Sequence, residues 1–113
     1  MTEHDAVNTA NALAARAAGW PDLTGSPKQI PWANTVRMDL IGAMETSDMT
    51  DHDRDRYRSV MLRETAAHAW IDSRNLSWHA RFIGSLTPEE LEALLAEGAR
   101  KAAEAAESGH GQQ

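Results

Sequence analysis

Apolar side chains recur every three or four residues along several segments of the chain, the spacing of an α-helix with one buried face. The short apolar runs between these segments lack the alternation of apolar and polar positions that marks a half-buried strand. We therefore expect an all-α fold, a small domain of three to four helices with frayed termini.

The first helical segment, residues 3–18, is rich in alanine. Its apolar stripe is thin and consists of Ala6, Ala10, Leu13, Ala14 and Ala17. Alanine favours helix but buries little area, so this segment offers little apolar surface for packing. We expect residues 1–19 to form a mobile helix, residues 20–98 a helical core domain, and residues 99–113 a helix end with a disordered tail.

A second helix is predicted over residues 26–44. Ser26 and Gln29 have the spacing of a capping box, in which each side chain bonds the backbone N–H of the other residue. Pro27 suits the first helical position, but Pro31 removes a backbone hydrogen bond and should loosen the first turn. A start at Ile30 or at Pro31 is therefore a second interpretation. The predicted core face consists of Ile30, Ala33, Val36, Leu40, Ile41 and Met44.

A third helix is predicted over residues 51–74, beginning near Thr50 or Asp51, where acidic side chains favour the positive end of the helix dipole. Its apolar positions are Tyr57, Val60, Met61, Ala67, Trp70 and Ile71. On a continuous helix, Arg63 and Arg74 would lie on one face with Trp70, placing two guanidinium groups beside one indole ring.

The chain after this helix is ambiguous until its last helix begins. Residues 75–86 predict either a short helix led by Asn75 or Ser77 or an ordered loop, with its apolar anchors at Leu76, Trp78, Phe82 and Ile83. A final helix is predicted from Thr87 to about residue 101, because a cap residue, a first-turn proline and Glu90 at the reciprocal capping position come in sequence. Its core face is Leu91, Leu94 and Leu95.

Composition narrows the class of protein. A chain of 113 residues suits one domain with a modest core. It contains no apolar run near the roughly 20 residues that cross a bilayer, and its first residues lack the basic start and apolar block of a signal peptide. We expect a cytoplasmic protein without a membrane partner. The absence of cysteine excludes disulfides, thiolate metal sites and cysteine nucleophiles.

The formal net charge of −6 is unevenly distributed. Residues 54–81 contain six arginines and three carboxylates, whereas residues 39–53 contain five carboxylates and no lysine or arginine. Residues 89–107 contain six glutamates against one arginine and one lysine. This basic middle between acidic flanks argues against general DNA affinity, because long-range steering follows the summed field.

The strongest candidate for binding is a surface rich in arginine and tryptophan. Its candidate residues are Lys28, Arg37, Arg56, Arg63, Arg74, Trp78, His79 and Arg81. Arginine with tryptophan suits single-stranded nucleic acid or an acidic protein surface. The alternative is that the acidic segments fold back and neutralise the arginines.

Five further residues are given structural roles. Ser26 and Gln29 are explained by the capping box, and Trp32 and Trp70 are expected to pack on each other as core anchors of successive antiparallel helices. Asp72 is expected to pair with an arginine, and Arg37 is one candidate partner.

Catalysis and metal binding are poorly supported. Glu64, His68 and Asp72 would form one stripe of the third helix, a carboxylate-flanked histidine suited to a metal or a general base. The stripe lacks a second histidine at the next turn, so a salt-bridged helix face is the simpler interpretation. The run of residues 51–55 imitates part of a calcium loop but lacks its central glycine and terminal glutamate. We expect no catalytic residue, metal or cofactor.

Two sequence stretches resemble a group of small uncharacterised bacterial proteins associated with phages and plasmids. The first follows the pattern Leu-Thr-Gly-Ser-x-Lys-Gln-Ile-x-Trp-Ala-x-x-Ile-Arg and covers residues 23–37, with Val36 in place of isoleucine. The second is Trp-Ile-Asp-x-Arg at residues 70–74. The resemblance implies a shared fold and a mobile-element context, and it assigns no activity.

These observations predict a non-catalytic binding or accessory protein of a mobile genetic element, contacting a protein partner or nucleic acid through its Trp/Arg surface. The alternative is an acidic inhibitor that imitates nucleic-acid phosphates towards a host defence or nucleic-acid-processing complex. An enzyme that uses Asp72 and His68 is a remote third hypothesis.

Overall fold

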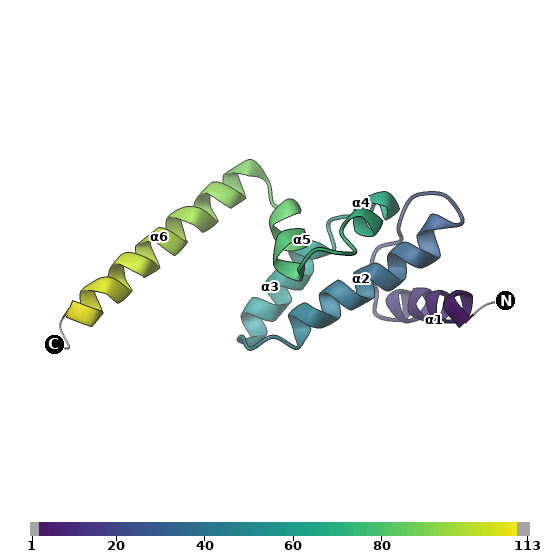
Figure 1. The fold of residues 1–113 in the computed structure, drawn as a ribbon, viewed down its shortest axis with the longest axis horizontal. Helices are drawn as coiled ribbons and strands as arrows, with labels where there is room; N and C mark the ends of the chain where they lie inside the picture. Colours follow the sequence, from purple (N-terminus) through teal and green to yellow (C-terminus); the bar gives the residue numbers. More distant parts are fainter. Residues whose placement is uncertain (1–2, 111–113) are drawn as a thin grey trace.

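The computed structural model describes the backbone of residues 3–110 and the side chains of residues 5–107, and this part of the chain is helical. Its helices are α1 (Glu3–Ala17), α2 (Gln29–Glu45), α3 (Asp51–Met61), α4 (Ala67–Asp72), α5 (Trp78–Gly84) and α6 (Pro88–His110). Figure 1 shows their arrangement. The all-α class is confirmed, but the expected count of three to four helices is wrong, since the described residues form six.

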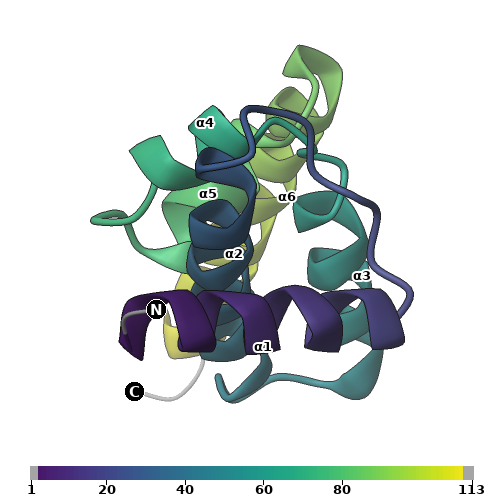
Figure 2. The ribbon, with the colours of Figure 1, turned by 90° about the vertical axis from the view of Figure 1, so that its right-hand side faces the viewer.

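Helix α2 lies at the centre of the molecule and packs against α1, α3, α4 and α5. Figure 2 shows α1 crossing one side of it. The buried side of α2 supplies much of the core, as its apolar spacing predicted: Ala33, Val36, Leu40, Ile41 and Met44 are all buried. The other helices add Val60, Met61, Ala67, Trp70, Ile71 and Phe82 to the same cluster.

The start of α2 combines both features that the sequence predicts. The Gln29 N–H donates to Ser26 Oγ at 3.2 Å, and the Ser26 N–H donates to Gln29 Oε1 at 3.3 Å, so the capping box forms. Regular helix nevertheless begins only at Gln29, and residues 27–28 form a turn. Pro31 explains the difference, because it has no N–H to bond the carbonyl of Pro27.

Residues 51–74 do not form one helix, which corrects the sequence prediction. Helix α3 ends at Met61 and α4 begins at Ala67. Between them the chain pairs with Thr24, whose N–H donates to Thr65 O at 2.7 Å and whose carbonyl accepts from the Ala67 N–H at 2.8 Å. These bonds occupy backbone groups that a continuous helix would use internally, and they leave Arg63 and Glu64 outside any helix.

Gly25 allows this pairing. Its φ is +153°, and a Cβ placed on it would lie 2.9 Å from the Cβ of the buried residue Ala67. Only glycine adopts this conformation without strain and permits so close an approach. Leu23, two residues earlier, is 6% exposed and belongs to the core. The Leu-Thr-Gly-Ser part of the motif is therefore explained by architecture.

The last two helices begin at local caps. Ser77 Oγ accepts from the Ala80 N–H, which selects Ser77 over Asn75 as the cap of α5. At α6, the Glu90 N–H donates to Thr87 Oγ1 and the Thr87 N–H donates to Glu90 Oε1, the expected capping box. Helix α6 continues to His110, beyond the predicted end near residue 101, and extends away from the other helices (Figure 1).

Helix α1 packs through a different face from the one predicted. The alanine stripe with Leu13 is exposed, and Leu13 itself is 64% exposed. The contact with α2 is largely polar: Asn11 Nδ2 donates to Thr35 Oγ1 at 3.1 Å, and Thr35 Oγ1 donates to Asn8 Oδ1 at 2.6 Å. Ala15, 2% exposed, is the buried apolar contact of this helix.

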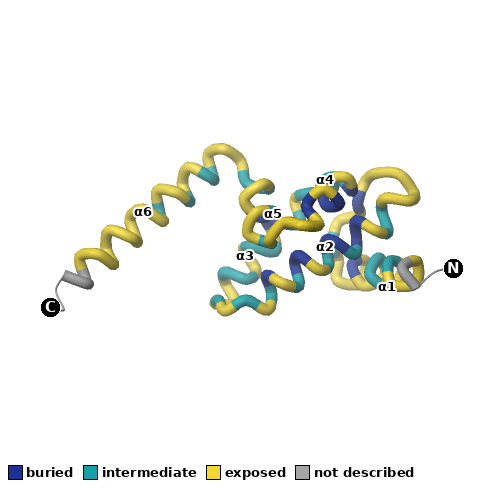
Figure 3. Tube along the Cα trace, viewed as in Figure 1, coloured by how far each residue is buried: buried dark blue, intermediate teal, exposed yellow. Residues whose placement is uncertain are grey.

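Burial divides the molecule into two parts. Figure 3 shows buried residues gathered around α2 and α4, while most of α6 is exposed. The principal extents are 64, 26 and 24 Å, so α6 makes the molecule elongated. Among the residues that were described, no helix has both the length and the apolar character needed to cross a membrane.

Candidate functional site

The two tryptophans of the sequence motifs have opposite environments. Trp70 is fully buried, and its Nε1–H donates to the Glu64 carbonyl at 2.9 Å. It is a core anchor, as expected. Trp32 is 43% exposed, so the expectation that it anchors the core is wrong. It lies at the edge of the buried face of α2, next to the fully buried residue Ala33.

Trp32 contacts an arginine where we expected a second indole. The guanidinium carbon of Arg74 lies 5.6 Å from the centroid of the Trp32 ring, a cation–π distance. Trp70 instead has the Arg81 guanidinium at 5.8 Å, and Arg63 lies elsewhere. The predicted face of two arginines around Trp70 does not form, because the break between α3 and α4 changes the helical register.

Lys28, Trp32 and Arg74 define what we call the Trp32 surface. Arg74 follows α4, and its Nη1 donates to the Ile71 carbonyl at 2.9 Å, which holds the side chain near the ring. Lys28 has helical dihedral angles, φ −81° and ψ −33°, one turn before Trp32, so both lie on the same side of the chain. Lys28 and Arg74 are both exposed. The surface thus offers one indole and two cations.

Most of the other arginines within residues 54–81 make contacts inside the molecule. Arg54 donates to the carbonyls of Glu45, Ser47 and Met49, closing the connection after α2. Arg58 pairs with Glu45 at 2.6 Å and with Asp55 at 2.8 Å, and the hydrogen bonds that it donates to these carboxylates raise its pKa. The Arg58–Glu45 ion pair corresponds to the alternative that an acidic segment folds back and neutralises the arginines.

Arg63 and Arg81 are also engaged. Both terminal nitrogens of Arg63 donate hydrogen bonds to the Glu90 carboxylate, at 2.6 and 3.0 Å. This contact joins the end of α3 to the start of α6. Arg81 lies 3.7 Å from the Glu64 carboxylate and donates to Ser73 Oγ. The hydrogen bond from Arg63, with those from Thr87, lowers the pKa of Glu90 to about 2.

Trp78 and His79 belong to a mixed aromatic group on α5. The Trp78 ring is half-buried, 5.6 Å from Tyr57, and it stacks on His79 at a centroid distance of 3.6 Å. His79 is exposed, as is Arg56 on α3, whose charge acts on the Glu97 carboxylate of α6. Neither Trp78 nor His79 adjoins Trp32 in a ring contact among the described residues. The predicted binding residues are therefore dispersed.

Arg37 has the least expected position of the candidate residues. It is 1% exposed, which removes it from any surface, and burial lowers its pKa while Asp22 acts in the opposite direction. Its Nη1 donates to the Pro21 carbonyl and its Nη2 to Asn34 Oδ1, both at 2.8 Å. In the described part of the chain it forms no ion pair, so the suggested pairing with Asp72 is wrong.

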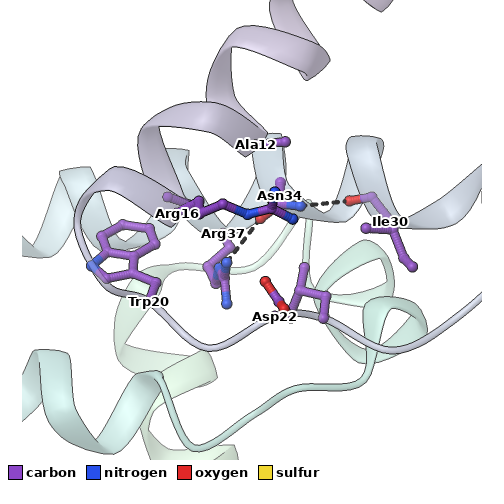
Figure 4. Close-up of a pocket in the computed structure, with 9 residues that line it drawn as sticks. Ala12, Arg16, Trp20, Asp22, Ile30, Asn34 and Arg37 are labelled. Atoms are coloured by element: carbon purple, nitrogen blue, oxygen red, sulfur yellow. Dashed lines mark hydrogen bonds between the residues drawn. The ribbon is translucent and has the colours of Figure 1, made fainter.

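Three residues that sequence reasoning missed lie around Arg37. They are Trp20, Asp22 and Asn34, which line a pocket beside α1 (Figure 4). A signal existed in the sequence, because Asn34 and Arg37 are polar residues at inward positions of an otherwise apolar helix face. Trp20 and Asp22 are in a connecting segment and carry no comparable periodicity.

The residues considered for catalysis or metal binding are separated by the break after α3. Glu64 lies in the connection, where its Oε2 accepts from the Ala66 N–H, while His68 and Asp72 are exposed on α4. Within residues whose side chains are described, no group of three or more His, Asp or Glu is placed to hold a metal ion. Models of protein families, curated proteins and solved structures give no match to this chain.

Proposed function

We propose that this chain is a cytoplasmic, non-catalytic binding protein of a mobile genetic element and that the Trp32 surface holds a protein partner. The observation that carries the proposal is the environment of Trp32, which is 43% exposed and has the Arg74 guanidinium 5.6 Å from its ring. The mobile-element context rests on the resemblance of residues 23–37 and 70–74 to small phage- and plasmid-associated bacterial proteins.

An exposed indole held by a neighbouring cation suits a protein interface. Trp and Arg are enriched among the few residues that provide most of the binding energy at such interfaces. Arg74 is itself fixed by its bond to the Ile71 carbonyl, so fewer side-chain rotamers are lost on binding. The fitting partner is an apolar pocket with a carboxylate at its edge, which would accept the indole and pair with Arg74 or Lys28.

Charge favours a protein over nucleic acid. The net charge is −6, and Arg54, Arg58, Arg63 and Arg81 are committed to internal carboxylates or carbonyls. Two exposed cations beside Trp32 are few for a surface that must neutralise several phosphates. The acidic-mimic alternative is also weakened, because Glu90, at the start of α6, is held by Arg63.

The test is selection of peptide ligands on the purified chain, followed by binding calorimetry with variants. We expect Trp32→Ala and Arg74→Ala each to weaken the selected peptides at least tenfold, since truncation of such an anchor costs about 2 kcal/mol or more. Leu13→Ala and Arg100→Ala remove exposed side chains elsewhere and serve as matched controls.

Two results would contradict the proposal. Peptides that bind the Trp32→Ala protein as tightly as the parent would show that the site lies elsewhere. A single-stranded oligonucleotide that binds at low salt, loses affinity steeply with salt and depends on Trp32 and Arg74 would make nucleic acid the partner.

A further inference from the structure

A pocket of about 280 Å³ lies between α1, α2 and the segment that connects them. Figure 4 shows its lining: Arg16 comes from the last turn of α1, Asn34 and Arg37 come from α2, and Trp20 and Asp22 come from the connection. Apolar side chains, including Leu23 and Ile30, complete the wall. This pocket is separate from the Trp32 surface and from the proposed function.

The charge of Arg37 is incompletely compensated. Its two hydrogen-bond acceptors, the Pro21 carbonyl and Asn34 Oδ1, are neutral, and its Nε is buried without a partner in the described residues. The Trp20 ring, 5.3 Å from the guanidinium, covers another side. A buried cation normally has a carboxylate in direct contact, because removing its hydration is unfavourable by several kcal/mol. Arg37 is itself 1% exposed, so an anion in the pocket would act on its charge from across the pocket wall and would add to the Coulombic effect of Asp22.

The other charged groups of the lining define which anion fits. Arg16 is exposed and lines the same pocket, so it can contact a ligand directly while Arg37 supplies charge from the wall. Asp22 lines the pocket too and opposes a second negative charge. The apolar lining at Leu23 and Ile30 favours a ligand with an apolar body over a fully hydrated ion.

We propose that this pocket binds a small monocarboxylate, with its carboxylate between Arg16 and Arg37 and its apolar body against Trp20, Leu23 and Ile30. Guanidinium groups bind carboxylates through paired, charge-assisted hydrogen bonds, and Arg16 has donors available for this geometry. The carboxylate belongs either to a free organic acid or to the carboxyl end of a peptide.

The test is an NMR titration of the full chain, observing the Arg37 Nε–H and Trp20 indole N–H resonances. Benzoate represents a free acid, N-acetylleucine represents a peptide carboxyl end, and benzamide and inorganic phosphate serve as comparison ligands. We expect saturable shifts with benzoate, N-acetylleucine or both, weaker binding of phosphate, and no binding of benzamide at the same concentrations. The tighter of the two acids identifies the source of the carboxylate.

Variants at exposed positions keep the test independent of folding. Arg16→Gln should weaken the binding about tenfold, because a hydrogen bond to a charged group contributes about 1.5 kcal/mol or more. Asp22→Asn should strengthen it, since the opposing carboxylate is removed. Arg100→Gln, an exposed arginine of α6, should leave it unchanged. Absence of saturable shifts, equal binding of benzamide, tighter binding of phosphate, or an unchanged affinity in Arg16→Gln would each overturn the proposal.

Discussion

The charged side chain of Arg37 is buried and hydrogen-bonded to neutral acceptors. Replacing it tests how much its hydrogen bonds and packing contribute to stability. Arg37→Ala removes two donors at 2.8 Å, leaves Asn34 Oδ1 without that partner, and creates a cavity. We expect a loss of about 3 kcal/mol in the free energy of unfolding, measured with urea. Arg37→Lys keeps the charge but lacks the planar guanidinium that bonds two acceptors at once. Its loss of unfolding free energy should be smaller but still measurable.

The matched control is Arg100→Ala, which removes an exposed arginine and should change stability by less than about 0.5 kcal/mol. An Arg37→Ala protein as stable as this control would mean that the guanidinium provides no net stabilisation. In that case the lack of a carboxylate in direct contact with Arg37 would have no measurable effect on stability.

Trp32 and Trp70 allow a direct comparison of an exposed and a buried indole. Trp70 is fully buried, and Trp70→Ala should lower the free energy of unfolding by about 3–5 kcal/mol, because a large cavity forms in the core. Trp32 is 43% exposed and Trp32→Ala should lower it by about 1 kcal/mol or less. Equal losses in denaturant titrations would contradict the assignment of Trp32 to the surface.

The spacing of apolar residues accounts for only part of these roles. The core face of α2 follows from spacing alone, since Ala33, Val36 and Leu40 recur at helical intervals. Arg37 and Trp32 do not follow from it. The acceptor that holds Arg37 includes a carbonyl 16 residues away, and the cation that covers Trp32 comes from beyond α4.

The capping boxes before α2 and α6 were predictable because their signals are local. Ser26 with Gln29 and Thr87 with Glu90 are each three residues apart, and both capping boxes form. The break between α3 and α4 was not predictable, because residues 62–66 contain neither glycine nor proline. It is made by Thr24, which bonds to Thr65 across 41 residues of chain.

Gly25 and Gly19 provide a matched test of this long-range pairing. Both have positive φ, +153° and +78°, but a Cβ at Gly25 meets the Ala67 Cβ at 2.9 Å, whereas one at Gly19 meets nothing within 4 Å. Gly19→Ala should cost about 1 kcal/mol through backbone strain alone. Gly25→Ala should cost about 3 kcal/mol, because it adds overpacking against α4.

The measurement is urea unfolding of both variants, with amide hydrogen exchange at Ala67 as a local readout. The Ala67 N–H bonds to the Thr24 carbonyl at 2.8 Å, so its protection should fall in Gly25→Ala and be retained in Gly19→Ala. Equal losses of unfolding free energy in the two variants would mean that contact between a Cβ at residue 25 and Ala67 adds no further destabilisation.

The attachment of α6 should respond to acid. The pKa of Glu90 is lowered to about 2 from its usual 4.5, with the Arg63 hydrogen bond as the main cause. A lowered pKa in the folded state means that the stabilisation is complete above about pH 5 and is lost as the pH falls towards 2. We expect the Arg63–Glu90 contact to weaken across this window.

Fluorescence energy transfer between labels on α2 and α6 would measure the attachment as a function of pH. Glu90→Gln should abolish the pH dependence, since its amide does not titrate, while Glu92→Gln, which alters an exposed neighbour on the same helix, should preserve it. A response that is identical in the parent and in Glu90→Gln would assign it to other carboxylates.

The fold consists of a packed body and a projecting helix. The radius of gyration is 17.4 Å, whereas a compact chain of this length would have about 13 Å. The core predicted for residues 20–98 contains the buried cluster, but α1 joins it through Asn8, Asn11 and Thr35, polar residues that an apolar pattern cannot reveal. Beyond Glu97, every described side chain of α6 is exposed.

A chain ending at Gly98 should therefore keep the stability of the body. It retains Leu94, which packs against the core, and the Arg63–Glu90 ion pair. The described side chains that it removes, those of residues 99–107, are all exposed, and the one ion pair that these described residues form is the surface Glu97–Lys101 pair. We expect its free energy of unfolding in urea to match that of the parent within about 0.5 kcal/mol. Helical circular dichroism should fall as those residues are lost, and small-angle scattering should show a smaller radius of gyration.

If the truncated chain loses more stability than this, repeating the unfolding at several protein concentrations separates two causes. A loss of stability that is the same at all protein concentrations would show that the end of α6 packs on the body of its own chain. A loss that appears only at high concentration would mean that the helix stabilises the parent by joining two copies, because association favours the folded state by mass action. If the end of α6 is exposed and unpacked, the truncated chain and the parent should unfold alike at both low and high protein concentration.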